Sequence, residues 1–277
     1  MTSINTNINA LTASNALSRN GNAQQKTMQE LSTGKRINRA SDDAAGLSIR
    51  ETMTAQITGL NTAIKNANDA ISMLQTADGA LSETSSLMQR MRELSVLAVN
   101  DTYSSTQKTA MSTEFTALAS QITQIAANTQ FNGMDLLSGS GGVYGGAGNF
   151  IFQIGGNTAQ TLTVAIASAT LNTYVLSGAT ITTAASATSN IASLDTAITT
   201  LNTQRSTIGA AVNRLSHALD NLASVAANAT DSRSKVEDTD YATATSDLAR
   251  QQIIAQAATA ILAQANQQPQ MVLSLLK

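Results

Sequence analysis

The sequence predicts a mainly α-helical protein: a long antiparallel coiled-coil helical bundle, in which the N- and C-terminal helices pair, with a small β-hairpin region. Three observations support this fold class. Apolar residues recur at 3,4 spacing over long stretches. The 277 residues contain only one proline, which leaves long helices uninterrupted. One mid-chain stretch changes to an apolar period of two, which is typical of β-strands.

The two ends of the chain carry apolar residues at helical spacing but almost no charge. The first charged side chain is Arg19, and residues 252–276 contain none. An amphipathic helix without charge on its polar face is poorly suited to standing alone in water. We therefore expect burial against copies of the chain, the alternative being ordinary terminal helices docked on their own domain. The apolar positions expected to support assembly are Ile4, Ile8, Leu11, Ile254, Ile261, Val272 and Leu275.

The pattern changes after the first predicted helix. Residues 34–46 combine glycines, capping residues and mixed charges, which indicates a linker followed by a helix start. A long helix is expected to begin near Ala44, because apolar residues follow 3,4 spacing from Ile57 and continue, less regularly, to Leu94.

Two further helices are predicted downstream. A break at residues 100–105 precedes a shorter helix with apolar residues from Phe115 to Ile125. The most regular pattern covers residues 191–226, where Arg205 is the only polar member of a strict 3,4 track. At about 1.5 Å per residue this helix spans about 54 Å. The long helices are expected to pack together as an antiparallel bundle, with the shorter helix as a third member.

The middle of the chain has a different periodicity. Residues 137–193 carry no charge, and apolar residues alternate on both sides of the turn sequence Gly155-Gly-Asn-Thr. This pattern predicts a β-hairpin. The low-complexity residues 167–189 are expected to form a short, exposed excursion. The alternating residues are Phe150, Phe152 and Ile154 before the turn and Leu162, Val164 and Ile166 after it.

The sequence offers no constellation for catalysis, metal binding or cofactor binding. Cysteine is absent and His217 is the only histidine, so neither thiolate chemistry nor a two-histidine metal motif can be built. We interpret His217 as a solvated helix residue. The carboxylate pairs Asp42–Asp43 and Glu237–Asp238 are interpreted as helix caps. We therefore expect that the chain is not an enzyme and that it binds neither a metal ion nor a cofactor.

Composition also argues against two classes of partner. A net charge of -2 provides no basic surface for phosphate backbones, and the 3% of aromatic residues leaves few stacking platforms, so we expect no nucleic acid. No stretch of about 18 apolar residues occurs, so we expect no membrane insertion. The first residues also lack the basic and continuous apolar parts of a signal peptide, so an exported chain would use a route without a cleaved signal.

One cluster concentrates charge on an otherwise charge-poor helix. It covers residues 89–96, with the sequence Gln-Arg-Met-Arg-Glu-Leu-Ser-Val. Arg90 and Glu93 can form an ion pair at i,i+3. Two interpretations remain open: the cluster supports the helix or contacts another subunit, or it is a recognition patch.

Six separated segments carry recognisable motifs: residues 31–47, 89–94, 129–133, 152–155, 236–242 and 262–276. Together and in this order, they resemble bacterial flagellin, the subunit of the flagellar filament. The match includes both ends of the chain. A structural subunit is therefore expected, which polymerises into the filament used for swimming.

The resemblance implies a layered subunit, with an inner and an outer domain joined by two linkers. The expected layout is an inner-domain N-terminal helix at 1–33, a linker at 34–46, the first part of an outer helical domain at 47–135, a β-hairpin and short variable segment at 136–188, the outer domain's C-terminal helix at 189–229, a second linker at 230–238 and the inner domain's C-terminal helix at 239–277.

The resemblance also implies partners and a location. The chain would be exported unfolded through the flagellar type III apparatus, with an export chaperone bound to its C-terminal segment. It would polymerise with itself into an extracellular filament, beneath a cap and next to junction proteins.

In the family, a host toll-like receptor recognises the segment matching residues 89–96 together with a glutamate on the next helix. Arg90, Leu94 and Glu114 occupy the matching positions. The candidate residues for receptor recognition and subunit contact are Gln89, Arg90, Arg92, Glu93, Leu94 and Glu114.

Three other classes of protein share parts of this sequence pattern. A hook-filament junction protein shares the architecture, but the complete motifs at both ends favour flagellin. A flagellin with a mid-chain protease is disfavoured by the single histidine and the missing HExxH motif. A monomeric helical adhesin or signalling module would keep its ends ordered without self-association.

Overall fold

The computed structural model describes residues 6–139 and 148–274, with side chains as far as residue 267. The described chain is mainly helical, which confirms the predicted fold class, and it divides into two compact units, residues 1–55 with 228–277 and residues 56–227. The elements are α1 (Ile8–Thr33), α2 (Ala44–Val99), α3 (Ser105–Asn128), β1 (Gln130–Phe131), β2 (Met134–Asp135), β3 (Asn149–Gln153), β4 (Thr161–Ala165), α4 (Ala184–Glu237) and α5 (Tyr241–Ser274).

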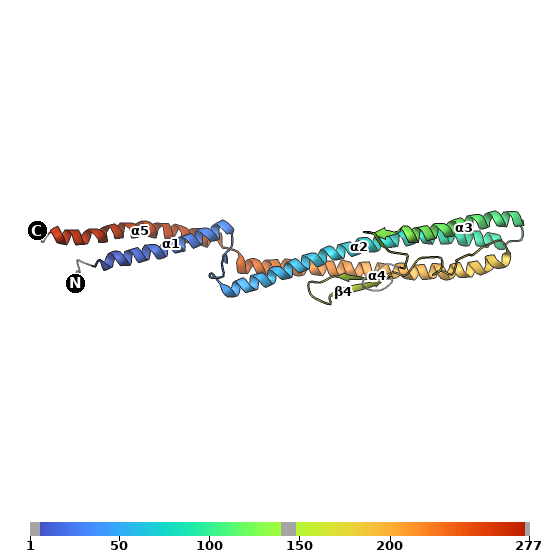
Figure 1. Cartoon of the computed structure of the whole chain (residues 1–277), viewed down its shortest axis with the longest axis horizontal. Coiled ribbons are helices and arrows are strands. Elements are labelled where there is room, and N and C mark those ends of the chain that lie inside the picture. The colour runs from blue at the N-terminus through green and yellow to red at the C-terminus, as the bar shows by residue number, and fades with distance from the viewer. Residues whose placement is uncertain (1–5, 140–147, 275–277) are drawn as a thin grey trace. The chain divides into compact units, whose positions relative to one another are not determined.

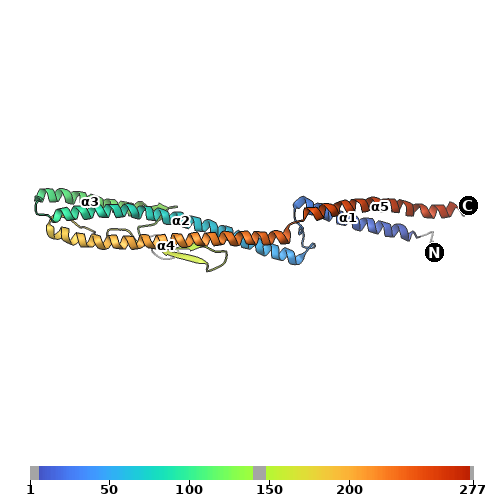
Figure 2. The ribbon, with the colours of Figure 1, turned by 180° about the vertical axis from the view of Figure 1, so that it is seen from behind.

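In the first unit, α1 and α5 lie side by side and antiparallel (Figures 1 and 2). The Asn7 side chain caps α1 by accepting a hydrogen bond from the Ala10 amide at 3.0 Å. Gly34, with φ of 70°, ends α1, because glycine adopts this left-handed conformation without a Cβ penalty. Helix α5 continues past Pro269 to Ser274.

The segments that connect this helix pair to the rest of the chain differ in length. The first, residues 34–43, is irregular as expected, and α2 starts at Ala44 as predicted. The second is shorter than expected, because α4 remains helical to Glu237 and leaves only residues 238–240 before α5.

In the second unit, α2, α3 and α4 form a bundle (Figure 1). The predicted 3,4 tracks face its core: Leu74, Leu81, Leu201 and Leu215 are all fully buried. The break after α2 falls at residues 100–104, as expected. Helix α3 then begins with a capping box between Ser104 and Gln107, and Phe115 fills the core from α3 with no exposed surface.

Two antiparallel hairpins cover part of this bundle. The predicted hairpin is confirmed, because β3 pairs with β4 in the register Phe150↔Val164 and Phe152↔Leu162. The second hairpin, β1–β2, was not predicted. Its turn residues Asn132 and Gly133 both have positive φ, 51° and 76°. An Asn-Gly pair between apolar residues is the sequence signal for such a turn.

Residues 167–183 are not the exposed excursion that the composition suggested. Their backbone is tied to the bundle by a hydrogen bond from the Ala169 amide to the Leu137 carbonyl, 2.9 Å. The buried side chains of Tyr174, Leu176 and Ile181 join the core. Hydrophobic burial therefore overrides the low-complexity signal, because a few spaced apolar residues are enough to anchor a loop.

Candidate functional site

The paired helices α1 and α5 display large apolar side chains to solvent. Ile8 is 63% exposed and Leu11 is 61% exposed on α1, and Ile254 and Ile261 are 45% and 58% exposed on α5. These are four of the seven predicted assembly positions. Val272 lies on α5, but its side chain is outside the described residues, as are Ile4 and Leu275.

The helix pair α1 and α5 contains few fully buried side chains, and its leucines Leu17, Leu31, Leu248 and Leu262 are only half-buried. Within the described residues, Thr27 is the only buried side chain of α1, and Ala244 and Ala265 are the buried ones of α5. Polar bonds join the helices instead: the Asn7 amide nitrogen donates to the Ala265 carbonyl at 2.8 Å, and the Asn20 amide nitrogen donates to the Gln251 carbonyl at 2.8 Å. The pair therefore lacks a core of its own.

A buried carboxylate joins the two connecting segments within the first unit. Glu237, 5% exposed, forms an ion pair with Lys35 and lies 3.8 Å from both the Arg50 and the Arg233 guanidinium. The Arg36 amide donates to the Glu237 carbonyl at 2.7 Å. Removing one member of such a buried cluster is costly, because the remaining charges lose their partners. Glu237 thus holds residues 35 and 36 against the end of α4, and as the last residue of that helix it is not the N-cap that the sequence predicted.

The predicted recognition cluster forms an exposed ion-pair network between α2 and α3. The Arg90 guanidinium lies 2.7 Å from a Glu93 carboxylate oxygen and 2.9 Å from a Glu114 carboxylate oxygen. The hydrogen bond to Glu93, followed by the one to Glu114, raises the pKa of Arg90. The structure therefore brings together three of the predicted site residues, from two helices.

The other members of the cluster point in different directions. Gln89 is exposed, whereas Leu94 is 2% exposed, so Leu94 supports α2 from the core and offers no accessible surface in this fold. Arg92 leaves the cluster and bonds Asp195 of α4, Nε to Oδ1, at 2.6 Å. That hydrogen bond lowers the pKa of Asp195. No local pattern indicates this partner, because 103 residues separate the two positions along the chain.

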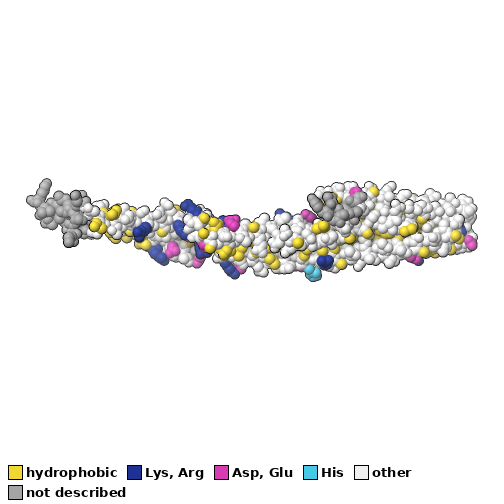
Figure 3. Space-filling view, turned by 60° about the horizontal axis from the view of Figure 1, so that its bottom comes forward, with side chains coloured by type: hydrophobic (Ala, Val, Ile, Leu, Met, Phe, Trp, Pro, Cys, Tyr) yellow, Lys and Arg dark blue, Asp and Glu magenta, His cyan; other side chains and the backbone are white. Residues whose placement is uncertain are grey.

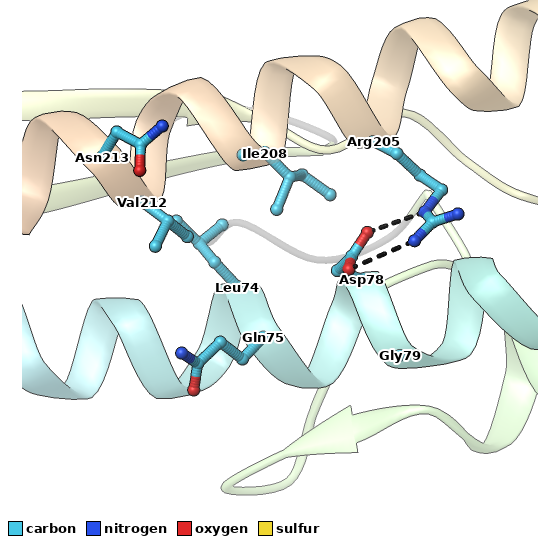
Figure 4. Close-up of a pocket in the computed structure, with 9 residues that line it drawn as sticks. Leu74, Gln75, Asp78, Gly79, Arg205, Ile208, Val212 and Asn213 are labelled. Carbon is cyan, nitrogen blue, oxygen red and sulfur yellow. Dashed lines mark hydrogen bonds and ion pairs between the residues drawn. The ribbon is translucent and has the colours of Figure 1, made fainter.

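A second ion pair crosses between α2 and α4. Arg205, the one polar member of the predicted apolar track, donates from Nε to Asp78 at 2.8 Å (Figure 4). The pair lies beside Leu74, Ile208 and Val212, in a shallow hollow of about 490 Å³ between the helices. Arg205 fits this seam because its guanidinium is half-exposed and reaches a partner at the edge of the apolar contact.

The residues set aside as non-catalytic behave as expected. His217 is exposed on α4. Asp42 accepts the Asn38 and Arg39 amides at 3.2 and 2.9 Å, and the bond from Arg39 is the largest cause of its lowered pKa. Asp43 accepts the Gly46 amide at 2.9 Å and caps the start of α2 as predicted, whereas Asp42 bonds amides of the preceding linker and caps no helix.

The described residues contain neither a metal-binding cluster nor a membrane-spanning helix. Over residues 6–139 and 148–274, no group of three or more His, Cys, Asp and Glu side chains could hold a metal ion. The same ranges contain no helix with the length and apolar character needed to cross a bilayer. On the face of the bundle drawn in Figure 3, uncharged polar and hydrophobic side chains cover much more area than charged ones.

Open apolar faces on a helix pair without its own core define a class of protein, a structural subunit that associates with copies of itself. The family model for the bacterial flagellin N-terminal helical region matches residues 4–141, and that for the C-terminal helical region matches residues 191–276. The chain belongs to the bacterial flagellin family. It is a subunit of the extracellular flagellar filament and not an enzyme, because flagellin is a structural protein family.

Individual relatives match over nearly the whole chain. A flagellin of Bacillus subtilis and a flagellin of Halalkalibacterium halodurans are each 40% identical, over 99% of this chain and 99% of their own length. Among solved structures, the crystal structure of Bacillus cereus flagellin has 32% identity and a TM-score of 0.50, and covers 57% of this chain and 88% of that one. These relatives favour a filament subunit over the hook-filament junction alternative.

Proposed function

We propose that α1 and α5 form the contact layer between subunits in the filament, with Ile8, Leu11, Ile254 and Ile261 as assembly residues. The observation that carries this proposal is their exposure, between 45% and 63%, on two helices that lie together. Large exposed apolar side chains favour association, since leaving them in water is unfavourable.

The composition of the helix pair supports the same assignment. Isolated helices gain most of their stability from packing of an apolar face. Here the fully buried side chains of α1 and α5 are small or polar, namely Thr27, Ala244 and Ala265, whereas the leucines are half-buried and several isoleucines are exposed. Neighbouring copies would provide the missing apolar contacts. Ile4, Val272 and Leu275 are proposed to extend this surface at the two ends.

The domain layout follows from this division of roles. Residues 1–33 and 239–277 form the inner domain, and residues 47–229 form the outer domain with its hairpins. Residues 34–46 and 230–238 connect the two, and the second connection includes the last turns of α4. The buried core of residues 56–227 supports an outer domain that is stable without neighbouring copies, because its long helices already bury their apolar tracks.

Seeded polymerisation tests this assignment. Purified chain is mixed with short filament fragments, and growth is followed by sedimentation and electron microscopy. Filaments are expected from the full chain, whereas deletion of residues 1–20 or 255–277 abolishes growth and leaves the helical circular dichroism signal of the outer domain. His217→Ala, a truncation at an exposed position outside α1 and α5, serves as the control. Normal growth of either deletion variant would refute the role of the helix pair.

The route to the filament is part of the proposal. Family membership supports export in an unfolded state through the flagellar type III apparatus, with an export chaperone on the C-terminal segment. It equally supports polymerisation beneath a cap, next to junction proteins. Weakly self-stabilised ends suit such a route, because they remain open to a chaperone until subunits meet.

A second proposal concerns recognition of the free monomer by the host toll-like receptor for flagellin. Its support is the exposed network of Arg90, Glu93 and Glu114 on adjacent helices, flanked by Gln89 and Arg92. Charged groups at a protein surface give specificity through electrostatic complementarity. Leu94 contributes by holding α2 in place.

A charge swap separates recognition from folding. Arg90→Glu is expected to weaken receptor signalling by the free monomer, while Arg214→Glu, the same change at an exposed position of α4, leaves it intact. The double variant Arg90→Glu with Glu114→Arg restores the ion pair but not the original charge pattern, so signalling stays weak. Full signalling by folded Arg90→Glu would remove the recognition proposal.

A further inference from the structure

The dipeptide Asn-Gly occurs twice in the chain, at residues 20–21 and at residues 132–133. It contains the groups for an internal reaction, because the glycine amide nitrogen lies next to the asparagine side-chain carbonyl and has no Cβ to shield it. Reactions between neighbouring groups of one molecule are favoured, since little entropy is lost in bringing them together. Whether this reaction proceeds depends on how the fold holds the two groups.

The first dipeptide is held by hydrogen bonds. The Asn20 side-chain nitrogen donates to the Gln251 carbonyl at 2.8 Å, which fixes this side chain against α5. Gly21 lies inside α1, where each backbone amide donates to a carbonyl of the preceding turn. Both residues are also partly buried. Even in a helix pair with few fully buried side chains, a reaction at Asn20 first requires these bonds to break.

The second dipeptide is open. Asn132 and Gly133 form the turn between β1 and β2, and both are exposed. Within residues 6–139 and 148–274, no hydrogen bond engages the Asn132 side chain or the Gly133 amide. An added Cβ at Gly133 would meet nothing within 4 Å, so the space beside the glycine is empty. Both reacting groups are therefore free and accessible to water.

The hairpin restrains this turn only weakly. Strands β1 and β2 have two residues each, shorter than strands usually are. Asn132 and Gly133 have positive φ, 51° and 76°, as a two-residue hairpin turn requires. Because no hydrogen bond anchors the Asn132 side chain, it can rotate until its carbonyl carbon faces the Gly133 nitrogen.

We propose that Asn132 is a site of spontaneous deamidation in the folded chain, from which Asn20 is protected. The Gly133 nitrogen forms a bond to the Asn132 side-chain carbonyl carbon. The bond from that carbon to the side-chain nitrogen breaks, and this nitrogen leaves with the glycine amide proton as ammonia. Water then opens the resulting succinimide ring at either carbonyl, which gives aspartate or isoaspartate. The net reaction consumes one water molecule and releases one ammonia, and it needs no other reactant.

The two products affect the fold differently. Aspartate leaves the backbone path unchanged and adds a charge at an exposed position. Isoaspartate extends the backbone by one methylene group, and the length of a hairpin turn sets the register of its strands. The strands continue into Leu136 and Leu137, which are 1% and 0% exposed in the bundle core, and the Leu136 amide donates to the Thr129 carbonyl at 3.0 Å. Isoaspartate at position 132 therefore loosens the connection that follows α3.

The site is tested by ageing the full-length monomer in mildly alkaline buffer and mapping its peptides by mass spectrometry. Conversion at residue 132 should be at least about fivefold faster than at residue 20, as expected when one hydrogen bond must break first. In guanidinium chloride, where the fold is absent, the two residues should react at similar rates. Absence of conversion at residue 132 in the folded chain, or equal folded-state rates at the two residues, would overturn the proposal.

The effect on the fold is tested by urea unfolding of the aged chain, with isoaspartate detected by an isoaspartyl methyltransferase. The fraction with isoaspartate at residue 132 should unfold at lower urea concentration than Asn132→Asp, which has the same charge on a normal backbone. Asn132→Gly cannot react and tolerates positive φ, so its unfolding midpoint should stay constant during ageing. Equal midpoints for the isoaspartate fraction and Asn132→Asp would contradict the loosened connection. Neither measurement involves polymerisation, so their failure would leave the assembly function untouched.

Discussion

Truncation of Ile261 to alanine separates the stability of the chain from the stability of the filament. Ile261 is 58% exposed on α5, so most of its side chain contributes nothing to the folded monomer. The substitution removes three carbon groups, each worth about 0.8 kcal/mol when fully buried. Scaled by the exposed fraction of 58%, the surface that filament packing can still bury is worth about 1.4 kcal/mol per subunit. The critical concentration should therefore rise about tenfold.

The assay is sedimentation of seeded filaments over a range of total protein concentrations, with the monomer checked by circular dichroism and urea unfolding. Ile151→Ala is the matched control, because Ile151 is 43% exposed on β3, outside the helix pair. We expect its critical concentration to change less than about twofold, within the usual range for surface substitutions. An unchanged critical concentration for Ile261→Ala, or a large loss of monomer stability, would contradict the proposed contact layer.

Two further predictions concern the chain alone. Gly79→Ala should raise the free energy of unfolding by about 0.5–1 kcal/mol in urea titrations, because Gly79 is inside α2 and an added Cβ meets nothing within 4 Å. Gly46→Ala should lower the free energy of unfolding, since its Cβ would lie 2.6 Å from Ile37 Cδ1. Asp195→Asn should reduce the decrease in unfolding free energy as the pH is lowered. Because the folded state lowers the pKa of Asp195, the carboxylate stabilises the fold above its unfolded pKa of 3.8, and this stabilisation is lost as the pH falls through the folded pKa. Identical acid unfolding curves for the original chain and Asp195→Asn would refute this role of the Arg92–Asp195 pair.

The helices were predictable because their signals are local. Apolar spacing located α2 and α4, and the start of α2 at Ala44 agrees with the change of pattern that precedes it. Where periodic apolar signals end, prediction of boundaries failed: α4 extends from Ala184 to Glu237, beyond the predicted 191–226. Residues at such ends are held by tertiary contacts, as Glu237 is by Lys35 and Arg50.

Short-range sequence signals predicted one of the two hairpins, β3–β4, and missed the other, β1–β2. Alternating apolar residues predicted β3 and β4 correctly, since strand period reports which face is buried. The Asn132-Gly133 turn was available as a signal in the sequence, but strands of two residues are too short for periodicity to reveal.

For the candidate site, the sequence predicted which residues are exposed and where the charged cluster lies, but not how its side chains pair. The uncharged ends predicted the open apolar faces, and Ile8 and Ile261 are exposed as that interpretation requires. The charged cluster was correctly located on α2, but its geometry was not predictable, because Arg90 and Arg92 find carboxylates on two different helices. Burial of Leu94 likewise depends on packing among α2, α3 and α4.

Long helices with weakly charged ends can be read from the amino-acid order alone, because periodicity and composition act along the chain. Tertiary packing sets which charges pair and anchors residues 167–183 to the bundle. Those outcomes depend on contacts between residues far apart in the chain, whose partners no local pattern specifies.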